Sequence, residues 1–245
     1  MTLTGERTLP GVPEENYWFR RHEAAYLALA PFALGAVVLE AGCGEGYGAA
    51  LLARTARRVV ALDADPTAAA HAAGAYPRAA YPHVQVVRAD LHRLPVAAGG
   101  AQVVAGLQVI EHLADQEGFL AECARVLRPA GTLLLTTPNR LTFSPGRDTP
   151  LNPFHTRELS AGELVTIVEK DFVVTRLLGL RHGRRLRRWE RRCGSLVDAQ
   201  LAGPPATWSP SLRRRVERVR AADFTLSGDG VDASLDLAIV AYRRP

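Results

Sequence analysis

The stretch that decides the fold is Val37-Val38-Leu39-Glu40-Ala41-Gly42-Cys43-Gly44-Glu45-Gly46-Tyr47-Gly48. An aliphatic run is followed at once by glycines at every second position and then by an alanine-rich helical pattern, which predicts a strand, a tight turn and a helix. Gly42, Gly44 and Gly46 lack the Cβ atoms that would keep a ligand from the backbone, and they allow positive φ where the chain reverses. Glu40 ends the strand and can accept hydrogen bonds from a cationic or hydroxylated ligand. We therefore expect a ligand at this turn.

The spacing of the glycines separates two classes of nucleotide-binding turn. A dinucleotide-binding turn has its last glycine three places after the second, and Tyr47 stands there instead. The acidic-x-Gly-x-Gly-x-Gly form resembles motif I of the class I S-adenosylmethionine-dependent methyltransferases. This resemblance implies an α/β Rossmann-like fold and S-adenosylmethionine as cofactor. The alternative is another nucleotide-like turn of an α/β protein.

The chain as a whole suits one large α/β domain, or one domain with an elaboration. Its 245 residues are 47% hydrophobic, which is enough for a proper core. No run approaches the roughly 18 apolar residues that span a bilayer, and the N-terminus lacks the pattern of a signal peptide. We expect a cytoplasmic protein without a membrane span.

Cysteine and charge patterns exclude other classes of site. Cys43, Cys123 and Cys193 are too widely spaced for a disulfide framework or a zinc site, so we interpret them as free thiols. The net charge is +5, but Lys170 is the only lysine among the basic residues. That bias indicates a GC-rich coding sequence rather than selection for a polyanion. We therefore do not expect a nucleic-acid partner.

A second strand, residues 57–63, ends in Asp63. If this strand is the parallel neighbour of the first, Asp63 lies beside the glycine turn, where its carboxylate can accept both ribose hydroxyls, with Ala64 next to it. Asp65-Pro66 is typical of a helix start, so we assign the helix cap to Asp65.

A third strand within residues 84–91 repeats the arrangement, since it too is followed by an acid. Asp90 can accept from the adenine amino group, with the backbone amide of Leu91 nearby. Methyltransferases of the class that the glycine turn resembles carry such an acid at this point. Three strand ends thus predict a pocket for adenosine and an amino acid.

The fourth strand, residues 101–107, leads to the predicted reaction site. Ligands of open parallel sheets bind beyond the carboxyl ends of the strands, so Gln108, Glu111 and His112 should reach the site, with Gln108 also expected to bind the cofactor. A helix over 115–127 follows. The phrase Arg125-Val-Leu-Arg-Pro-Ala-Gly131 then resembles the turn that precedes the fifth strand of these enzymes.

Residues 138–157 hold four prolines and no periodic pattern. A loop of this length inside a compact domain is uncommon and usually functional, so we assign it to the acceptor pocket. It contains His155. Thr156 is a candidate cap for a helix that runs to about Lys170.

The remaining strands complete the predicted sheet. Residues 172–178 and 234–242 bring it to seven strands, mostly parallel, with helices on both faces and an antiparallel last strand. Residues 181–192 carry seven arginines, which we interpret as solvated helix faces rather than a polyanion-binding surface. The predicted organisation is an arm and lid helix over 1–36, a cofactor-binding core over 37–180, a basic helical elaboration over 181–233 and a last strand over 234–245.

The predicted N-terminal helix, residues 14–30, contains three adjacent aromatic residues, Tyr17, Trp18 and Phe19. These point in different directions, so at least one should face something other than the main core. In many methyltransferases that this chain resembles, such a segment closes the cofactor pocket, and Arg20 or Arg21 would then meet the cofactor carboxylate. The alternative is that the aromatics pack the helix onto the sheet while the arginines are solvated.

The chemistry of the acceptor has two routes. The sulfonium of the donor already activates the methyl group, so the enzyme must align the acceptor and help a hydroxyl lose its proton. His112, with Glu111 beside it, is the best-placed general base. A metal is the other route, and Gln108, Glu111, His112 and His155 are oxygen and nitrogen donors.

The pattern of these donors is similar to that of magnesium- or manganese-dependent methyltransferases, including small-RNA ribose methylases. Gln108 stands in place of their first Glu, and the loss of one anionic ligand weakens a site for a hard cation. The resemblance therefore implies a metal held by Glu111, His112 and His155, whereas the alternative is that His155 only caps a helix.

A closer resemblance covers most of the chain. It is carried by Leu3–Thr8, Glu15–His22, Glu40–Gly48, Thr137–Arg140 and Arg157–Leu159. These segments are similar to an actinobacterial methyltransferase group associated with polymethylated glucan, or methylglucose lipopolysaccharide, synthesis. The resemblance implies O-methylation of a sugar or oligosaccharide hydroxyl. Other hypotheses are an RNA ribose methylase that uses the arginine surface, a methyltransferase of phenols or other small molecules, and a cofactor-binding regulator without catalysis.

Overall fold

The structure is a computed structural model that describes residues 7–245. Residues 1–6, which include Leu3–Glu6 of the resemblance, lie outside the described residues. The chain divides into two compact units. One contains the chain up to Ala24 together with Arg181–Thr225, and the other contains Ala25–Leu180 together with Leu226–Pro245.

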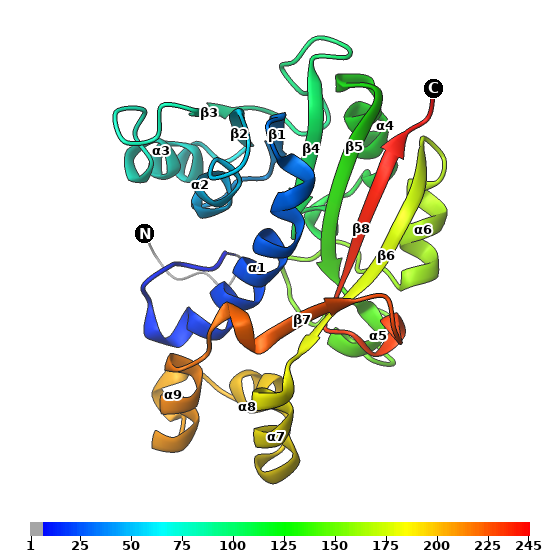
Figure 1. The fold of residues 1–245 in the computed structure, drawn as a ribbon. Helices are drawn as coiled ribbons and strands as arrows, with labels where there is room; N and C mark the ends of the chain where they lie inside the picture. Colours follow the sequence, from blue (N-terminus) through cyan, green and yellow to red (C-terminus); the bar gives the residue numbers. More distant parts are fainter. Residues whose placement is uncertain (1–6) are drawn as a thin grey trace. The chain divides into compact units, whose positions relative to one another are not determined.

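The sheet has eight strands in the order β3-β2-β1-β4-β5-β8-β6-β7 (Figure 1). The strands are β1 (Val37–Ala41), β2 (Arg58–Asp63), β3 (Val84–Arg88), β4 (Ala101–Leu107), β5 (Leu127–Pro138), β6 (Phe172–His182), β7 (Phe224–Ser227) and β8 (Asp236–Arg243). Strands β1 to β5 pair in parallel, whereas β8 is antiparallel to β5 and β6. The predicted fold class is confirmed. The predicted number of strands is wrong by one, because β7 is too short to give an alternating pattern.

Most helices follow the predicted course with shifted ends, but a short helix, α5, lies within residues 138–157, which are predicted to form an irregular loop. The helices are α1 (Asn16–Leu29), α2 (Tyr47–Leu52), α3 (Pro66–Ala75), α4 (Gln116–Val126), α5 (Arg140–Phe143), α6 (Ala161–Val168), α7 (Arg184–Cys193), α8 (Leu196–Leu201) and α9 (Pro210–Glu217). Asp65 caps α3 by accepting from the Thr67 amide at 2.7 Å, as predicted. The predicted cap at Thr156 is wrong, because Ser160 and Glu163 form a capping box at the start of α6.

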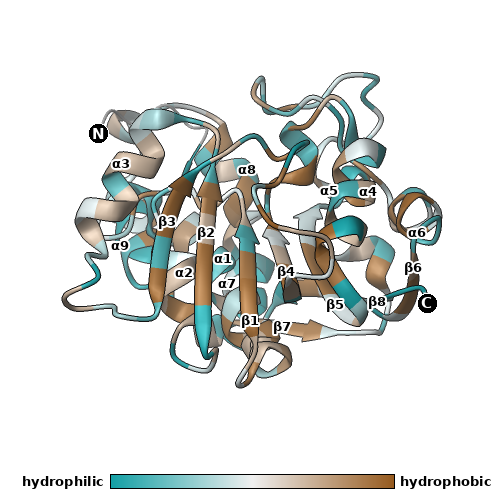
Figure 2. Cartoon of the chain, turned by 90° about the horizontal axis from the view of Figure 1, so that it is seen from above, coloured by the Kyte–Doolittle hydropathy of each residue, from teal (hydrophilic) through white to brown (hydrophobic). Residues whose placement is uncertain are grey.

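Both faces of the sheet are buried in the larger unit. Successive residues of a strand point to opposite faces, and the two hydrophobic clusters divide the strands accordingly. Leu39 and Leu62 join one cluster with residues of α4 and α6, and Val38 and Ala61 join the other with residues of α1, α2 and α3. The strands are accordingly hydrophobic along most of their length (Figure 2). This two-sided burial holds the strand ends in fixed positions.

The smaller unit has a polar chain of contacts at its centre. Tyr17 is fully buried, and its hydroxyl lies 2.7 Å from Nε2 of His182, whose Nδ1 lies 2.8 Å from the Glu190 carboxylate. Tyr17 therefore packs inside this unit, whereas the predicted lid role of the helix stays a prediction. Most of the arginines of α7 are exposed, in line with solvated helix faces.

None of the helices among residues 7–245 combines the length and the apolar composition that crossing a membrane requires.

Candidate active site

The candidate site lies where the order of the strands reverses. β1 pairs with β2 on one side and with β4 on the other. The chain therefore adds β2 and β3 on one side of β1 and then crosses to add β4 and β5 on the other side. In such sheets the crevice beyond the carboxyl ends of the strands is the usual ligand site. Glu40 in β1 and Gln108 after β4 both lie at this edge.

The glycine turn is fixed by its own backbone. Gly42, Gly44 and Gly46 have φ of 75°, 48° and 84°, in the left-handed region that favours glycine. A Cβ atom on Gly42 would lie 2.1 Å from Cγ2 of Val109. The glycines are therefore required by conformation and packing, and their contact with a ligand stays a prediction.

Glu40 is buried behind this turn with a single hydrogen-bond partner. The Tyr26 hydroxyl donates to its Oε1 at 2.8 Å, while Oε2 is buried and has no hydrogen-bond partner within residues 7–245. Burial raises the pKa of Glu40 to about 8. A Cβ atom on Gly48 would lie 2.3 Å from Glu40 Oε1 and 2.4 Å from the Tyr26 hydroxyl, so the fourth glycine makes room for this pair. A cation near Oε2 would stabilise the carboxylate.

Asp63 is the last residue of β2 and Asp90 follows the neighbouring strand β3, as predicted. Asp63 is buried, and its carboxylate accepts from the amides of Gly44 at 2.8 Å and Asp65 at 3.0 Å, so it ties the glycine turn to the end of β2. The Ala89 amide donates to the Asp63 carbonyl at 2.9 Å, which brings the end of β3 alongside.

The side chain of Asp90 is 69% exposed and lies beside His92. The His92 backbone amide holds the pKa of Asp90 below its usual value. Leu91 is buried in the core and Ala64 is exposed, and the contact of either residue with the cofactor stays a prediction.

Arg20 belongs to the smaller unit, where it forms an ion pair with Glu23 at 2.6 Å. Its contact with a cofactor carboxylate stays a prediction.

The chain leaves β4 at Gln108, whose φ of 56° is unusual for a residue other than glycine and whose contact with the cofactor stays a prediction. Its amide nitrogen donates to the Thr136 hydroxyl at 3.2 Å. The chain then forms a short 3-10 helix, Ile110–His112. Strained backbone of this kind is frequent at functional sites.

Glu111 is a second buried carboxyl. The Thr137 hydroxyl donates to its Oε2 at 3.0 Å. Burial raises the pKa of Glu111 to about 8, and the nearby carboxylates of Asp236 and Glu158 act in the same direction.

His112 and His155 come together across more than 40 positions of sequence, as predicted. Their ring centroids are 4.9 Å apart at an interplanar angle of 88°. Ligand atoms of Glu111, His112 and His155 all lie within 4.8 Å of one another. Ser160, five positions after His155, caps α6, so the alternative in which His155 only caps that helix is wrong.

The hydrogen bonds of the two rings define their tautomers. Nδ1 of His112 lies 2.9 Å from the Phe154 carbonyl oxygen, which can only accept, so Nδ1 carries the proton and Nε2 of the neutral ring carries the lone pair. Nδ1 of His155 lies 2.7 Å from Oε1 of Glu158, and its Nε2 lies 3.1 Å from the Asn152 amide nitrogen. The same reasoning therefore places the His155 proton on Nδ1.

Three members of the site have no counterpart in the sequence prediction, namely Tyr26, Thr137 and Glu158. Tyr26 and Thr137 each donate to a buried glutamate, and Glu158 holds His155. Glu158 follows His155 by three positions, a spacing that was available in the sequence as a signal. For Tyr26 and Thr137 no local pattern exists, because each meets its partner through the fold.

Comparison with known proteins identifies the family. Residues 39–135 match the model of a methyltransferase domain. The chain is 52% identical over 253 residues to a probable S-adenosylmethionine-dependent methyltransferase of Mycobacterium tuberculosis, covering 99% of this chain and 90% of the relative. The chain belongs to the S-adenosylmethionine-dependent methyltransferases.

Two further comparisons bear on this S-adenosylmethionine-dependent methyltransferase. It is 38% identical over 117 residues to a ubiquinone biosynthesis O-methyltransferase of Caulobacter vibrioides, covering 46% of this chain and 44% of the relative. A putative methyltransferase of Haloferax volcanii, solved in complex with the activator Trm112, is similar in fold, with a TM-score of 0.65 and 17% identity over 95% of this chain and 92% of that one.

The residues at the carboxyl edge fit S-adenosylmethionine. Oε2 of Glu40 is a buried acceptor without a hydrogen-bond partner among the described residues, which suits the ammonium of the methionine part. Asp63 ends the neighbouring strand β2, where its carboxylate suits hydroxyl groups, and Asp90 lies exposed after β3. The assignment of individual cofactor contacts to these residues stays a prediction.

Proposed function

We propose that this methyltransferase transfers a methyl group to a hydroxyl oxygen of a sugar or oligosaccharide, with His112 as general base. The observation that carries the proposal is the His112 tautomer, because Nδ1 donates to the Phe154 carbonyl and Nε2 keeps a lone pair. A side chain held in this way can accept a proton without first changing its tautomer.

The reaction requires one bond to form and one to break. S-adenosylmethionine supplies a methyl group already activated by its sulfonium. The acceptor oxygen attacks this carbon in line, the carbon–sulfur bond breaks as the carbon–oxygen bond forms, and the hydroxyl proton passes to Nε2 of His112. Alignment and proton removal are therefore the tasks left to the protein.

The residues around His112 support proton transfer. The buried carboxyl of Glu111 adjoins it in sequence, and His155, which is held by the Glu158 carboxylate at 2.7 Å, packs edge-on against its ring. The Glu158 carboxylate stabilises positive charge on the two neighbouring imidazole rings, which makes it easier for His112 to accept a proton.

An aliphatic hydroxyl suits this machinery better than a phenol. A phenol ionises with a pKa of about 10 and needs less help from a base, whereas a sugar hydroxyl is a much weaker acid. Transfer to oxygen is in keeping with the name of the Caulobacter vibrioides relative. The choice of a sugar, rather than another alcohol, rests on the resemblance to the glucan-associated group.

A second candidate is metal-assisted transfer, and the donor set fits a divalent cation. Metal-bound histidines usually donate their other ring N–H to a carboxylate or a carbonyl, as His155 and His112 both do here. Glu111, His112 and His155 would hold magnesium or manganese, which would make a bound hydroxyl more acidic. To bind the metal through Nε2, His155 would have to give up the contact of that atom with the side-chain amide of Asn152.

The test is a methyl-transfer assay with labelled S-adenosylmethionine and four acceptors, namely glucan oligomers, a simple phenol, a short RNA and buffer alone. We expect label in the glucan oligomers. Transfer to the phenol or RNA alone would overturn the sugar assignment. Cofactor binding by calorimetry without transfer to any acceptor in the panel would point to a binding protein instead.

The same assay separates the base from the metal. Activity that survives extensive treatment with EDTA, and that is lost in His112→Ala, supports the base. Activity that EDTA removes and manganese or magnesium restores supports the metal.

A further inference from the structure

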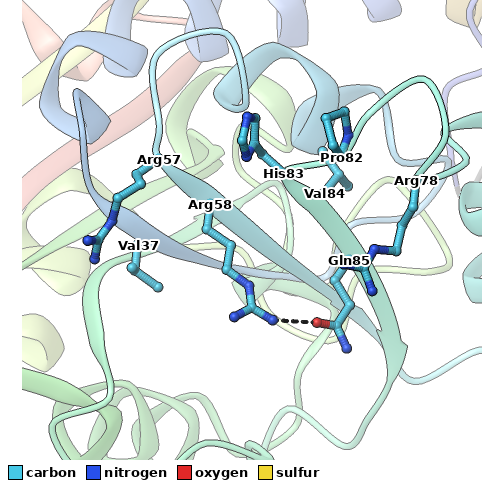
Figure 3. Close-up of a pocket in the computed structure, with 8 residues that line it drawn as sticks. All are labelled: Val37, Arg57, Arg58, Arg78, Pro82, His83, Val84 and Gln85. Atoms are coloured by element: carbon cyan, nitrogen blue, oxygen red, sulfur yellow. Dashed lines mark hydrogen bonds between the residues drawn. The ribbon is translucent and has the colours of Figure 1, made fainter.

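A second hollow lies at the opposite edge of the sheet, where β1, β2 and β3 begin. Its volume is about 440 Å³ (Figure 3). Arg57 and Arg58 lie at the start of β2, and Arg78 and His83 lie in the connection between α3 and β3. All of them belong to the larger unit. This hollow is separate from the candidate active site, which lies at the carboxyl ends of the strands.

The positive charge around this hollow is not neutralised. No aspartate or glutamate lines it. Arg58 donates to the neutral Oε1 of Gln85 at 2.6 Å, and among residues 7–245 the side chains of Arg57 and Arg78 have no hydrogen bond or ion pair. Elsewhere in the chain Arg125 and Arg140 each pair with a glutamate. Like charges gathered around one hollow attract an anion.

The lining groups are mainly donors. Each guanidinium offers five N–H groups and no acceptor, and Gln85 has used its carbonyl oxygen to accept from Arg58. The side chains of Arg58 and Arg78 both extend toward Gln85 (Figure 3). Forked guanidinium groups match the oxygens of a phosphate. No phenylalanine, tyrosine or tryptophan lines the hollow, so it has no platform for stacking a nucleobase.

We propose that this hollow binds a small molecule that carries two phosphate groups, such as a pyrophosphate or a doubly phosphorylated sugar. The three arginines that line the hollow carry three positive charges, whereas one phosphate group carries a charge of only about −1.5 to −2. A volume of about 440 Å³ lies in the range of small-ligand pockets and exceeds what one phosphate fills. Because the hollow and the glycine turn lie at opposite edges, the ligand and S-adenosylmethionine bind without competing.

The test is calorimetry on the full chain with pyrophosphate as the probe, at low salt. We expect saturable binding that weakens as salt is added. Arg58→Gln and Arg78→Gln should each weaken it about tenfold or more, because each removes charged hydrogen bonds. Arg128→Gln is the matched control, since Arg128 is an exposed arginine at the start of β5 that does not line the hollow. Its affinity for pyrophosphate should equal that of the wild type.

Absence of saturable pyrophosphate binding would overturn the proposal, as would equal losses in Arg128→Gln and the two hollow variants. Tighter binding of a short RNA than of pyrophosphate, lost in the same variants, would overturn it in favour of a nucleic-acid surface. Unchanged melting temperature and S-adenosylmethionine affinity in each variant show that the fold is intact.

Discussion

The two halves of the carboxyl edge are built around similar glutamates in different surroundings. Glu40 and Glu111 are both buried, each accepts from one hydroxyl group, and burial raises the pKa of each to about 8. Glu40 lies behind the glycine turn with Tyr26. Glu111 instead adjoins two histidines and has Glu158 and Asp236 close enough to raise its pKa further. The first arrangement suits the binding of a fixed cation, and the second suits the movement of a proton.

This difference gives the largest expected effect. His112→Ala should lower kcat by roughly 10² to 10⁴ while the affinity for S-adenosylmethionine stays unchanged, because it removes a base from the acceptor half alone. Single-turnover transfer and calorimetry measure the two quantities. A kcat close to that of the wild type would mean that the acceptor half does not supply the base.

Glu158→Gln tests whether the buried carboxylate that contacts His155 contributes to catalysis. Glutamine can still accept from the ring but lacks the charge, so we expect a loss of roughly 10- to 100-fold in kcat. The acidic limb of the pH profile should also shift to lower pH, because the imidazolium loses its carboxylate. Glu117→Gln is the control, since Glu117 forms only an exposed ion pair with Lys170. A parallel loss in both variants, or an unchanged pH profile, would mean that Glu158 is structural.

The same comparison explains how far the sequence predicts the site. In the cofactor half Glu40, Asp63 and Asp90 each lie at or just after the end of a strand, so their positions follow from the strand ends. In the acceptor half His155 reaches His112 only because the loop over 138–157 returns to the sheet. The sequence predicts the loop and His155, whereas the contact with Glu158 is missed although its three-residue spacing from His155 is visible in the sequence.

The misses have local causes. Strand β7 is missed because its four residues, Phe224–Ser227, are too few to show an alternating pattern. Thr156 was given the cap that Ser160 makes, although Glu163 stands three places after Ser160 and completes a capping box. Thr156 instead donates to the His112 carbonyl at 3.0 Å, which ties the loop to the acceptor half.

Gly48→Ala should damage the cofactor half selectively. The new Cβ atom would meet both Glu40 and Tyr26, so we expect a loss of about 1–3 kcal/mol in stability together with weaker S-adenosylmethionine binding. Gly74→Ala is the matched control, because a Cβ atom there meets nothing within 4 Å and Gly74 lies in α3. That change should be neutral or stabilising by up to about 1 kcal/mol. Equal effects of the two changes on cofactor binding would contradict the role given to the Glu40–Tyr26 pair.

The smallest effect concerns the pH dependence of the cofactor-free protein. The pKa of Glu40 is about 8 in the folded chain and 4.5 in its ordinary range, so between these values unfolding releases a proton. Stability should therefore fall as pH rises through this window, and Glu40→Gln should remove that part of the fall. The fall in melting temperature from pH 6 to pH 8.5 should be a few degrees smaller in Glu40→Gln than in the wild type. Glu111 is present in both proteins, so its contribution cancels in this comparison. In the wild type, saturating S-adenosylmethionine should reduce the fall, because its ammonium would stabilise the carboxylate. Identical slopes for wild type and variant would show that Glu40 does not hold a proton in the folded chain.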